Sequence, residues 1–378
     1  MGLWSQSSET ESDVFANLRA NPPKAGALIV HVTKPIPEGE SLYITGSHIT
    51  LGNWDPARVS MSRIDDTTFF HSFDGSMEDG VEFKITMGTW EREMLIDGMK
   101  GPNLRYEKQP IIYEFWNVEF SEAGALLSQP SIGKVKHYPN FEDSKGKIKS
   151  RNVWVWTPDN YDSKAEDASD WVVIIMHDGQ NLIDPKTSNY GVEWRVDETA
   201  DSLISGKHTR PFIVIGINSS VDRHQEYMGN LSPAYIDWVL NQVVPTVRKE
   251  FTFSESVDDI FSGGSSAGGA VSFVMHTQHR DHVGGAICMS PALFYKGFDS
   301  LTPFVDGPKK DINLYLDNGG LELELVLQPS IDFLLQNLEN KGYESPKDYT
   351  YVSDPNAKHF ESAWAHRLPF AIVYALRK

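Results

Sequence analysis

Short runs of β-branched and aromatic residues, separated by turn-forming clusters of Pro, Gly and Asp, fill the chain from about residue 25 to residue 121. Such runs, bounded by such clusters, are typical of strands. The pattern predicts strands at residues 27–33, 41–46, 68–73, 81–86 and 111–116. No helical period is found before residue 120, so we predict a small all-β sandwich domain here.

The pattern changes after residue 147, where continuous apolar runs alternate with helical periods. Continuous apolar runs are typical of strands buried on both faces of a parallel sheet. We predict strands at 151–156, 171–176, 211–216, 259–261, 283–288, 311–316 and 349–352, and helices at 234–251, 325–341 and 362–376. This alternation indicates a doubly wound, mostly parallel sheet with helices on both faces.

These patterns divide the chain into four parts. A polar tail rich in Ser and Glu occupies residues 1–24, and we expect it to be mobile. The β-sandwich occupies residues 25–121, a connector residues 122–146, and the α/β domain residues 147–378.

Charge and composition exclude some classes of partner. The formal charge of the 378 residues is −18, so a phosphate backbone or an anionic membrane surface is an unfavourable partner. A neutral glycan or an ester fits this balance, as does a purely solubilising role for the charge. The single cysteine, Cys288, allows no intrachain disulfide.

Location is left open by the sequence. No apolar run reaches the length of a membrane span. The N-terminus as given has neither the basic start nor the apolar stretch of a signal peptide, so we expect a cytoplasmic protein, or a secreted or periplasmic one if a leader has been removed.

The segment Gly264-Ser265-Ser266-Ala267-Gly268 carries the first candidate chemistry. It follows a predicted strand and opens a helix, which is the context of a nucleophile elbow with the pattern Gly-x-Ser-x-Gly. The turn is strained and crowded, and glycines at the flanking positions relieve the crowding. Ser266 fits the pattern, whereas Ser265 would place Ala267 at the last position.

A serine nucleophile needs a base and an acid, which follow it in this order along an α/β-hydrolase chain. His359 comes after the last predicted strand, at the sheet edge where the serine is expected, and His366 is a weaker alternative. The loop after the 311–316 strand supplies three carboxylates, Asp317, Glu322 and Glu324. Position favours Glu322 as the acid, with Asp317 as second choice.

The oxyanion formed during ester attack needs two backbone donors. We predict the amide of Ala267, directly after the nucleophile, as the first. The second is expected in the loop after the 171–176 strand, where we choose Gln180. This chemistry requires neither a cofactor nor a metal ion.

Several motifs in order resemble the putative-esterase superfamily, which includes carbohydrate esterase family 1 and the enterochelin esterases. The resemblance covers roughly residues 130–378, and these are its motifs: His177-Asp-Gly-Gln-Asn181, Trp194-Arg-Val-Asp-Glu198, Arg223-His-Gln-Glu-Tyr227, Gly264-Ser-Ser-Ala-Gly-Gly269 and His359-Phe-Glu-Ser-Ala-Trp364. It implies an α/β-hydrolase fold and metal-independent acyl chemistry. It also supports Glu322 as the acid, and suggests a structural pair of Arg223 with Glu226.

The N-terminal region resembles a starch-binding, family 20 carbohydrate-binding module over about residues 26–120, through Leu42-Tyr-Ile-Thr-Gly46, Leu51-Gly-Asn-Trp-Asp-Pro56 and Val81-Glu-Phe-Lys-Ile-Thr86. In that family two exposed tryptophans and a lysine bind glucan. The resemblance implies a carbohydrate site of Trp54, Lys84 and Trp90, with Asn103 as a hydrogen-bonding partner. Sugar rings stack their apolar faces on such indoles.

Three histidines, His276, His279 and His282, follow the nucleophile helix at intervals of three. They lack the spacing of a zinc site, so we interpret them as an exposed helix end.

Two hypotheses of different class follow. The first is a serine carboxylic-ester hydrolase that acts through an acyl-enzyme on feruloyl or acetyl groups linked to a glycan, or alternatively on a small or siderophore-type ester. The second is a glucan- or xylan-binding protein whose hydrolase domain is catalytically degenerate.

Overall fold

The computed structural model describes residues 20, 22–90, 92–96, 99–101, 103–121, 130, 132–295 and 297–377. The chain divides into two compact units, Met1–Ala125 and Leu126–Lys378. This boundary lies inside the stretch predicted as a connector. The tail predicted at residues 1–24 falls almost wholly outside the described residues.

The N-terminal unit is built from two β-sheets that share one apolar core. The first sheet has the order β4 (Ser62–Arg63), β5 (Thr68–Ser72), β1 (Ala27–Val32), β10 (Ile112–Phe120), β7 (Met94–Ile96) and β8 (Met99–Lys100). The second has the order β3 (Val59–Ser60), β2 (Tyr43–Gly46), β6 (Glu82–Thr86) and β9 (Leu104–Arg105). Leu28 of one sheet and Phe83 of the other lie in the common core. All five strands predicted for this region are present.

The C-terminal unit contains an eight-stranded sheet. Its order is β11 (Lys134–Phe141), β12 (Arg151–Thr157), β14 (Phe212–Ile217), β13 (Val172–His177), β15 (Ile260–Ser265), β16 (Gly285–Met289), β19 (Leu314–Gly319) and β20 (Tyr349–Asp354). Strands β11 and β12 pair antiparallel, and every pairing from β14 to β20 is parallel. The carboxyl ends of the parallel strands therefore share one edge, where ligands bind in open α/β sheets.

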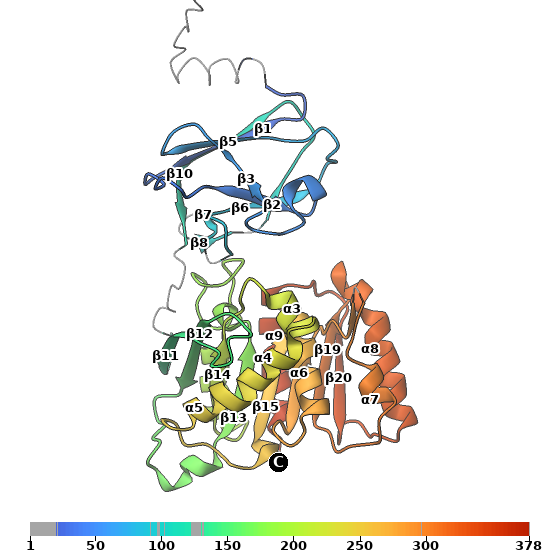
Figure 1. Ribbon diagram of the computed structural model, residues 1–378. Coiled ribbons are helices and arrows are strands. Elements are labelled where there is room, and N and C mark those ends of the chain that lie inside the picture. Colours follow the sequence, from blue (N-terminus) through green and yellow to red (C-terminus); the bar gives the residue numbers. More distant parts are fainter. Residues whose placement is uncertain are drawn as a thin grey trace, which may run out of the picture. The chain divides into compact units, whose positions relative to one another are not determined.

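Helices cover both faces of this sheet (Figure 1). They are α2 (Val196–Ser205), α3 (Arg223–Met228), α4 (Ser232–Trp238), α5 (Val244–Val247), α6 (Ala267–Gln278), α7 (Thr302–Val305), α8 (Leu323–Asn340) and α9 (Glu361–Ala375). Side chains of α3 to α6 pack in one apolar core and those of α2 and α9 in another, on the opposite side of the central strands. A short hairpin of β17 (Phe294–Tyr295) and β18 (Phe298–Asp299) follows β16. None of the described helices has the length and apolar character that crossing a membrane requires.

Strand β11 and the helix predicted at 234–251 differ from the sequence expectation. Strand β11 lies within the predicted connector, where its alternation of polar and half-buried residues on a sheet edge left little apolar signal. The helix predicted at 234–251 is interrupted by a π-helical turn, Val239–Val243, and ends at Val247. A proline at position 245, which cannot donate a backbone hydrogen bond, coincides with this break.

Candidate active site

Ser266 lies in the turn between β15 and α6, as predicted. It has φ 55° and ψ −121°, a backbone conformation that residues with a side chain rarely adopt. Such strain costs about 1–3 kcal/mol and persists only where the surroundings impose it. Two hydrogen bonds fix the turn: Ser266 N donates to Met289 O at 2.9 Å, and Ala292 N donates to Ser266 O at 3.0 Å. The Ser266 side chain is half-buried.

Close packing explains the glycines of the motif. A Cβ atom on Gly264 would lie 2.9 Å from the backbone of Gly268, which real Cβ atoms do not tolerate. A Cβ on Gly268 would lie 3.2 Å from Asp178 Oδ2. The start of α6 is therefore packed against both the end of β15 and the loop after β13.

That loop holds Gln180, the second predicted oxyanion donor. Gln180 belongs to the short helical turn Gly179–Asn181, and the first N–H groups of a helix have no partner within it. The same holds for Ala267, the first residue of α6. The Gln180 side chain is engaged elsewhere, because its amide donates to Ser219 Oγ and accepts from Ser219 N, both at 2.9 Å.

An ion pair anchors this loop. Arg223 on α3 donates to both carboxylate oxygens of Asp178, at 2.6 and 2.7 Å. The backbone N–H of Asp178 also donates to the hydroxyl of Tyr227 at 3.3 Å. The expected pair of Arg223 with Glu226 is therefore wrong, since Glu226 is buried against Arg151 of β12.

His359 lies in the loop between β20 and α9, and its side chain is only 12% exposed. Its Nδ1 is 3.3 Å from Oε2 of Glu324, in the first turn of α8, which is within ion-pair reach but without hydrogen-bond alignment. The segment after β16 connects this pair to the turn at Ser266, because Ala292 N donates to Ser266 O and Ser290 Oγ donates to Glu324 Oε1 at 2.7 Å.

Glu322 does not take the place predicted for the acid. Its side chain is 63% exposed and forms an ion pair with Lys358 at 2.6 Å. Glu324, two residues later, is fully buried and faces His359 instead. Glu322 precedes α8 in a non-helical conformation, whereas Glu324 lies in the first turn of the helix, so the two side chains project in different directions.

Asp317, the second choice, is also not beside His359. It is fully buried at the end of β19, and both its oxygens are engaged. Arg367 of α9 holds them at 3.0 Å each, and Tyr315 donates to Oδ2 at 3.1 Å. Burial raises the pKa of Asp317, and Arg367 opposes that rise.

The other histidines serve different roles. His366 is exposed on α9, in a groove of about 640 Å³ between α2 and α9, and does not approach Glu324. His276 is fully buried rather than part of an exposed helix end, and accepts from Asn313 N at 3.2 Å. Burial lowers the pKa of His276 to about 4, so it is neutral at physiological pH.

The family model described as "Putative esterase" matches residues 147–372. The chain belongs to this putative esterase family. It is therefore a carboxylic ester hydrolase, and its C-terminal unit has the α/β-hydrolase fold that the motif resemblance implied. A comparison with curated proteins finds no match.

Solved structures of other proteins share this fold at low sequence identity. A ferulic acid esterase has a TM-score of 0.52 at 17% identity and covers 65% of this chain and 99% of its own. An enterobactin esterase from Shigella flexneri has a TM-score of 0.53 at 14% identity and covers 97% of this chain and 98% of its own. A BES protein from Bacillus cereus has a TM-score of 0.51 at 13% identity, covering 67% of this chain and 99% of its own.

The predicted carbohydrate residues of the N-terminal unit are only partly brought together. Trp54 and Trp90 are half-buried, with ring centroids 6.3 Å apart and planes at 41°. Asn103 donates to Glu82 Oε2 at 2.9 Å. Lys84 cannot belong to an exposed site, because it is buried and its amine is paired with Glu93 and donates to Gly101 O at 2.7 Å.

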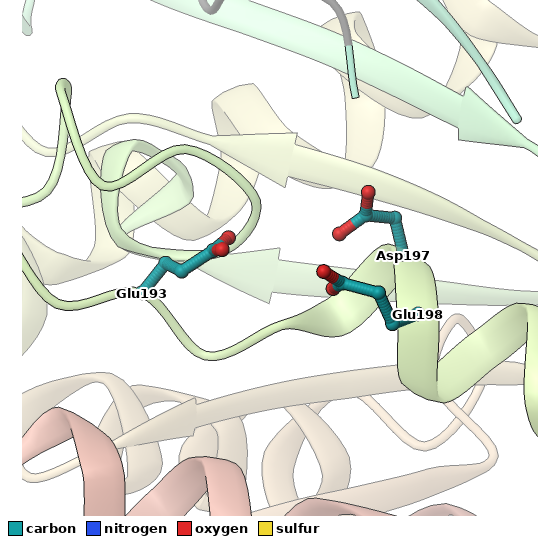
Figure 2. Close-up of side chains that lie close together, drawn as sticks. All are labelled: Glu193, Asp197 and Glu198. Carbon is teal, nitrogen blue, oxygen red and sulfur yellow. The ribbon is translucent and has the colours of Figure 1, made fainter. Parts of the chain in front are cut away.

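Three acidic side chains gather at the start of α2: Glu193, Asp197 and Glu198 (Figure 2). One oxygen from each lies within 4.8 Å of the others, close enough in principle to hold a metal ion. Burial, together with the charges of Glu198 and Asp197, raises the pKa of Glu193 to about 7. Protonation of Glu193 relieves the crowding of like charges.

The sequence predicted neither the position of Glu324 beside His359 nor the hydrogen bond from Ser290 to Glu324. Glu324 was one of three carboxylates in the loop, and no pattern distinguished it. Ser290 follows β16 in a stretch without any motif, so the sequence contained no signal for it.

Proposed function

We propose that this esterase hydrolyses carboxylic esters through an acyl-enzyme on Ser266, with His359 as the base and Glu324 as the acid. The observation that carries the proposal is the buried pair of Glu324 and His359 Nδ1. This pair leaves Nε2 as the nitrogen available to the serine, and the segment after β16 bonds to both the nucleophile turn and the acid.

The reaction follows from these positions. Ser266 Oγ attacks the ester carbonyl while His359 Nε2 accepts its proton, and Glu324 stabilises the imidazolium that forms. The N–H groups of Ala267 and Gln180 donate to the oxyanion, aided by the positive end of the α6 dipole. His359 returns the proton to the departing alcohol. Water then hydrolyses the acyl-enzyme by the same path.

A fluorophosphonate probe tests the nucleophile directly. The full chain is treated with the probe, and the modified residue is identified by peptide mass spectrometry. We expect one adduct on Ser266, retained in Ser265→Ala and absent in Ser266→Ala. An adduct on another serine, or none while ester hydrolysis continues, would refute the assignment.

For the substrate we propose first a feruloyl or acetyl ester on a neutral polysaccharide. The acidic chain, with a net charge of −18, favours a neutral ligand, and the half-buried rings of Trp54 and Trp90 offer a stacking surface. Feruloylated arabinoxylan, acetylated xylan and p-nitrophenyl acetate would be compared as substrates.

The matched variants separate sugar binding from catalysis. The double change Trp54→Ala, Trp90→Ala is expected to lower activity on polysaccharide several-fold and to leave p-nitrophenyl acetate hydrolysis unchanged. Trp116→Ala is the control, because Trp116 is an exposed tryptophan of the same unit that stacks on His31 instead. Equal loss in both variants would argue against a site at Trp54 and Trp90.

A siderophore-type ester is the second candidate. The likeness to the enterobactin esterase extends over 97% of this chain and so includes both units, whereas that to the ferulic acid esterase covers 65%. A cyclic catecholate triester assayed beside feruloylated arabinoxylan distinguishes the two. A kcat/KM at least about 100-fold higher on the triester would favour the second candidate over the first.

A further inference from the structure

Ser290 occupies a constrained position directly after β16. Its φ is 41°, in the left-handed region, and its side chain is fully buried. The backbone N–H donates to both the carbonyl and Oδ1 of Asp317, at 3.1 and 3.0 Å. Strand β19 therefore holds the residue in place from one side.

Within the described part of the chain, the hydroxyl of Ser290 has three hydrogen-bonding neighbours. Trp364 Nε1 lies 3.1 Å away and Arg367 Nη2 lies 3.0 Å away, and both groups can only donate. A hydroxyl has one proton and two acceptor lone pairs. With both lone pairs taken, the proton is directed at the third neighbour, Oε1 of Glu324, at 2.7 Å.

The donors are themselves fixed. Arg367 is held by both oxygens of Asp317, and the Trp364 indole donates to Ser290 Oγ. The Trp364 ring also packs edge-on against the His359 imidazole, with centroids 4.9 Å apart and planes at 88°. The orientation of the Ser290 proton is thus imposed by α9 and β19 together.

We propose that Ser290 is a positioning residue, whose hydroxyl holds Oε1 of Glu324 so that Oε2 faces His359. The proposal rests on the proposed function, because it assigns a role through the acid and the base. Without the hydroxyl, the Glu324 carboxylate can rotate away from His359. A misplacement of this order lowers the rate by about 10- to 100-fold.

A double-mutant cycle with Glu324 tests the proposal. Ser290→Ala, Glu324→Gln and the combined variant are assayed as full chains on p-nitrophenyl acetate. We expect Ser290→Ala to lower kcat about 10- to 100-fold with KM within about twofold. In the Glu324→Gln background the same change should alter kcat by less than about threefold, because the group that Ser290 positions is already lost.

Tyr315→Phe is the matched structural control. It removes another hydrogen bond from the same buried cluster, that of Tyr315 to Asp317, without touching Ser290 or Glu324. Thermal unfolding should show a lower melting temperature than the parent for both Ser290→Ala and Tyr315→Phe. The kcat of Tyr315→Phe should stay within about twofold of the parent. Ser290→Cys, whose thiol is a weaker donor, is the second variant if Ser290→Ala does not fold, and its kcat should fall below that of the parent.

The outcomes separate the two proposals. Fully additive effects of Ser290→Ala and Glu324→Gln would overturn the positioning role, as would a kcat of Ser290→Ala and Ser290→Cys no lower than that of Tyr315→Phe. Fluorophosphonate labelling of Ser266 in the parent chain reads out the proposed function independently. If labelling is present and the cycle is additive, only the role of Ser290 fails.

Discussion

Two strand–turn–helix connections of the esterase sheet have nearly the same backbone. Ser266 precedes α6 with φ 55° and ψ −121°, and Glu322 precedes α8 with φ 56° and ψ −122°. Both follow parallel strands and lie at the carboxyl edge of the sheet. Both residues carry a side chain in a conformation that favours glycine.

The two turns differ in which side chain they present to the proposed site. At the first turn the strained residue is itself the proposed nucleophile. At the second, the strained Glu322 lies in solvent beside Lys358, and the buried Glu324 faces His359. The comparison shows that the turn pattern identifies the edge of the sheet where the proposed site lies. The packing of the helices on the sheet then decides which side chain faces that site.

The largest expected effect contrasts the two strained residues. Ser266→Ala is expected to lower kcat about 10⁴- to 10⁶-fold, because attack and acyl transfer both need its hydroxyl. Glu322→Ala is expected to change kcat by less than about threefold. Steady-state hydrolysis of p-nitrophenyl acetate measures both. A similar loss in the two variants would break the comparison.

The next contrast is between Glu322 and Glu324, at the connection between β19 and α8. Glu324→Gln is expected to lower kcat about 10³- to 10⁴-fold, since the imidazolium loses its carboxylate and the imidazole its fixed tautomer. Glu322→Gln is the matched control, with the same chemical change two residues away and a kcat within about threefold of the parent. The reverse order of effects would restore Glu322 as the acid.

The backbone strain itself is a smaller effect and is expected at both turns. Glu322→Gly should be more stable than Glu322→Ala by about 1 kcal/mol, because glycine adopts the strained conformation freely although it is more flexible when unfolded. Ser266→Gly should likewise be more stable than Ser266→Ala. Thermal unfolding of the four variants measures the differences, and a more stable alanine variant at either position would contradict equal strain.

The smallest effect concerns the exposed ion pair. Lys358→Met is expected to lower stability by about 0.5 kcal/mol or less, because an exposed pair gains little in water and is screened by salt. Activity should stay within about twofold of the parent. Lys358→Arg is the control that keeps the charge, and a large loss of activity in Lys358→Met alone would give Glu322 a role in catalysis.

The sequence pattern was most informative where structure and chemistry are local. The approach of Gly264 to Gly268 involves residues four apart, so the motif itself contains the condition that selects Ser266. Continuous apolar runs indicate buried strands, and each strand predicted for the α/β region is present. The edge strand β11 was missed because its side chains are only half-buried.

Charged residues were harder to place than apolar ones. Lys84 has the sequence context of a surface lysine, yet it is buried against Glu93, nine residues away and just before β7. The same uncertainty applied to Asp317, which α9 neutralises through Arg367. The position of a buried charged side chain depends on the oppositely charged residue that pairs with it. The sequence around Lys84 or Asp317 does not indicate which residue that is.

The sequence by itself therefore determined the turn at Ser266, the order of the strands along the chain and the histidine after the last strand, because each depends on neighbouring residues. Only the tertiary structure decided that Glu324 faces His359 and that Ser290 bonds to Glu324. These contacts join α8, the loop before α9 and the end of β16, segments 34 or more residues apart. Their geometry depends on how helices pack on the sheet, which no local pattern encodes.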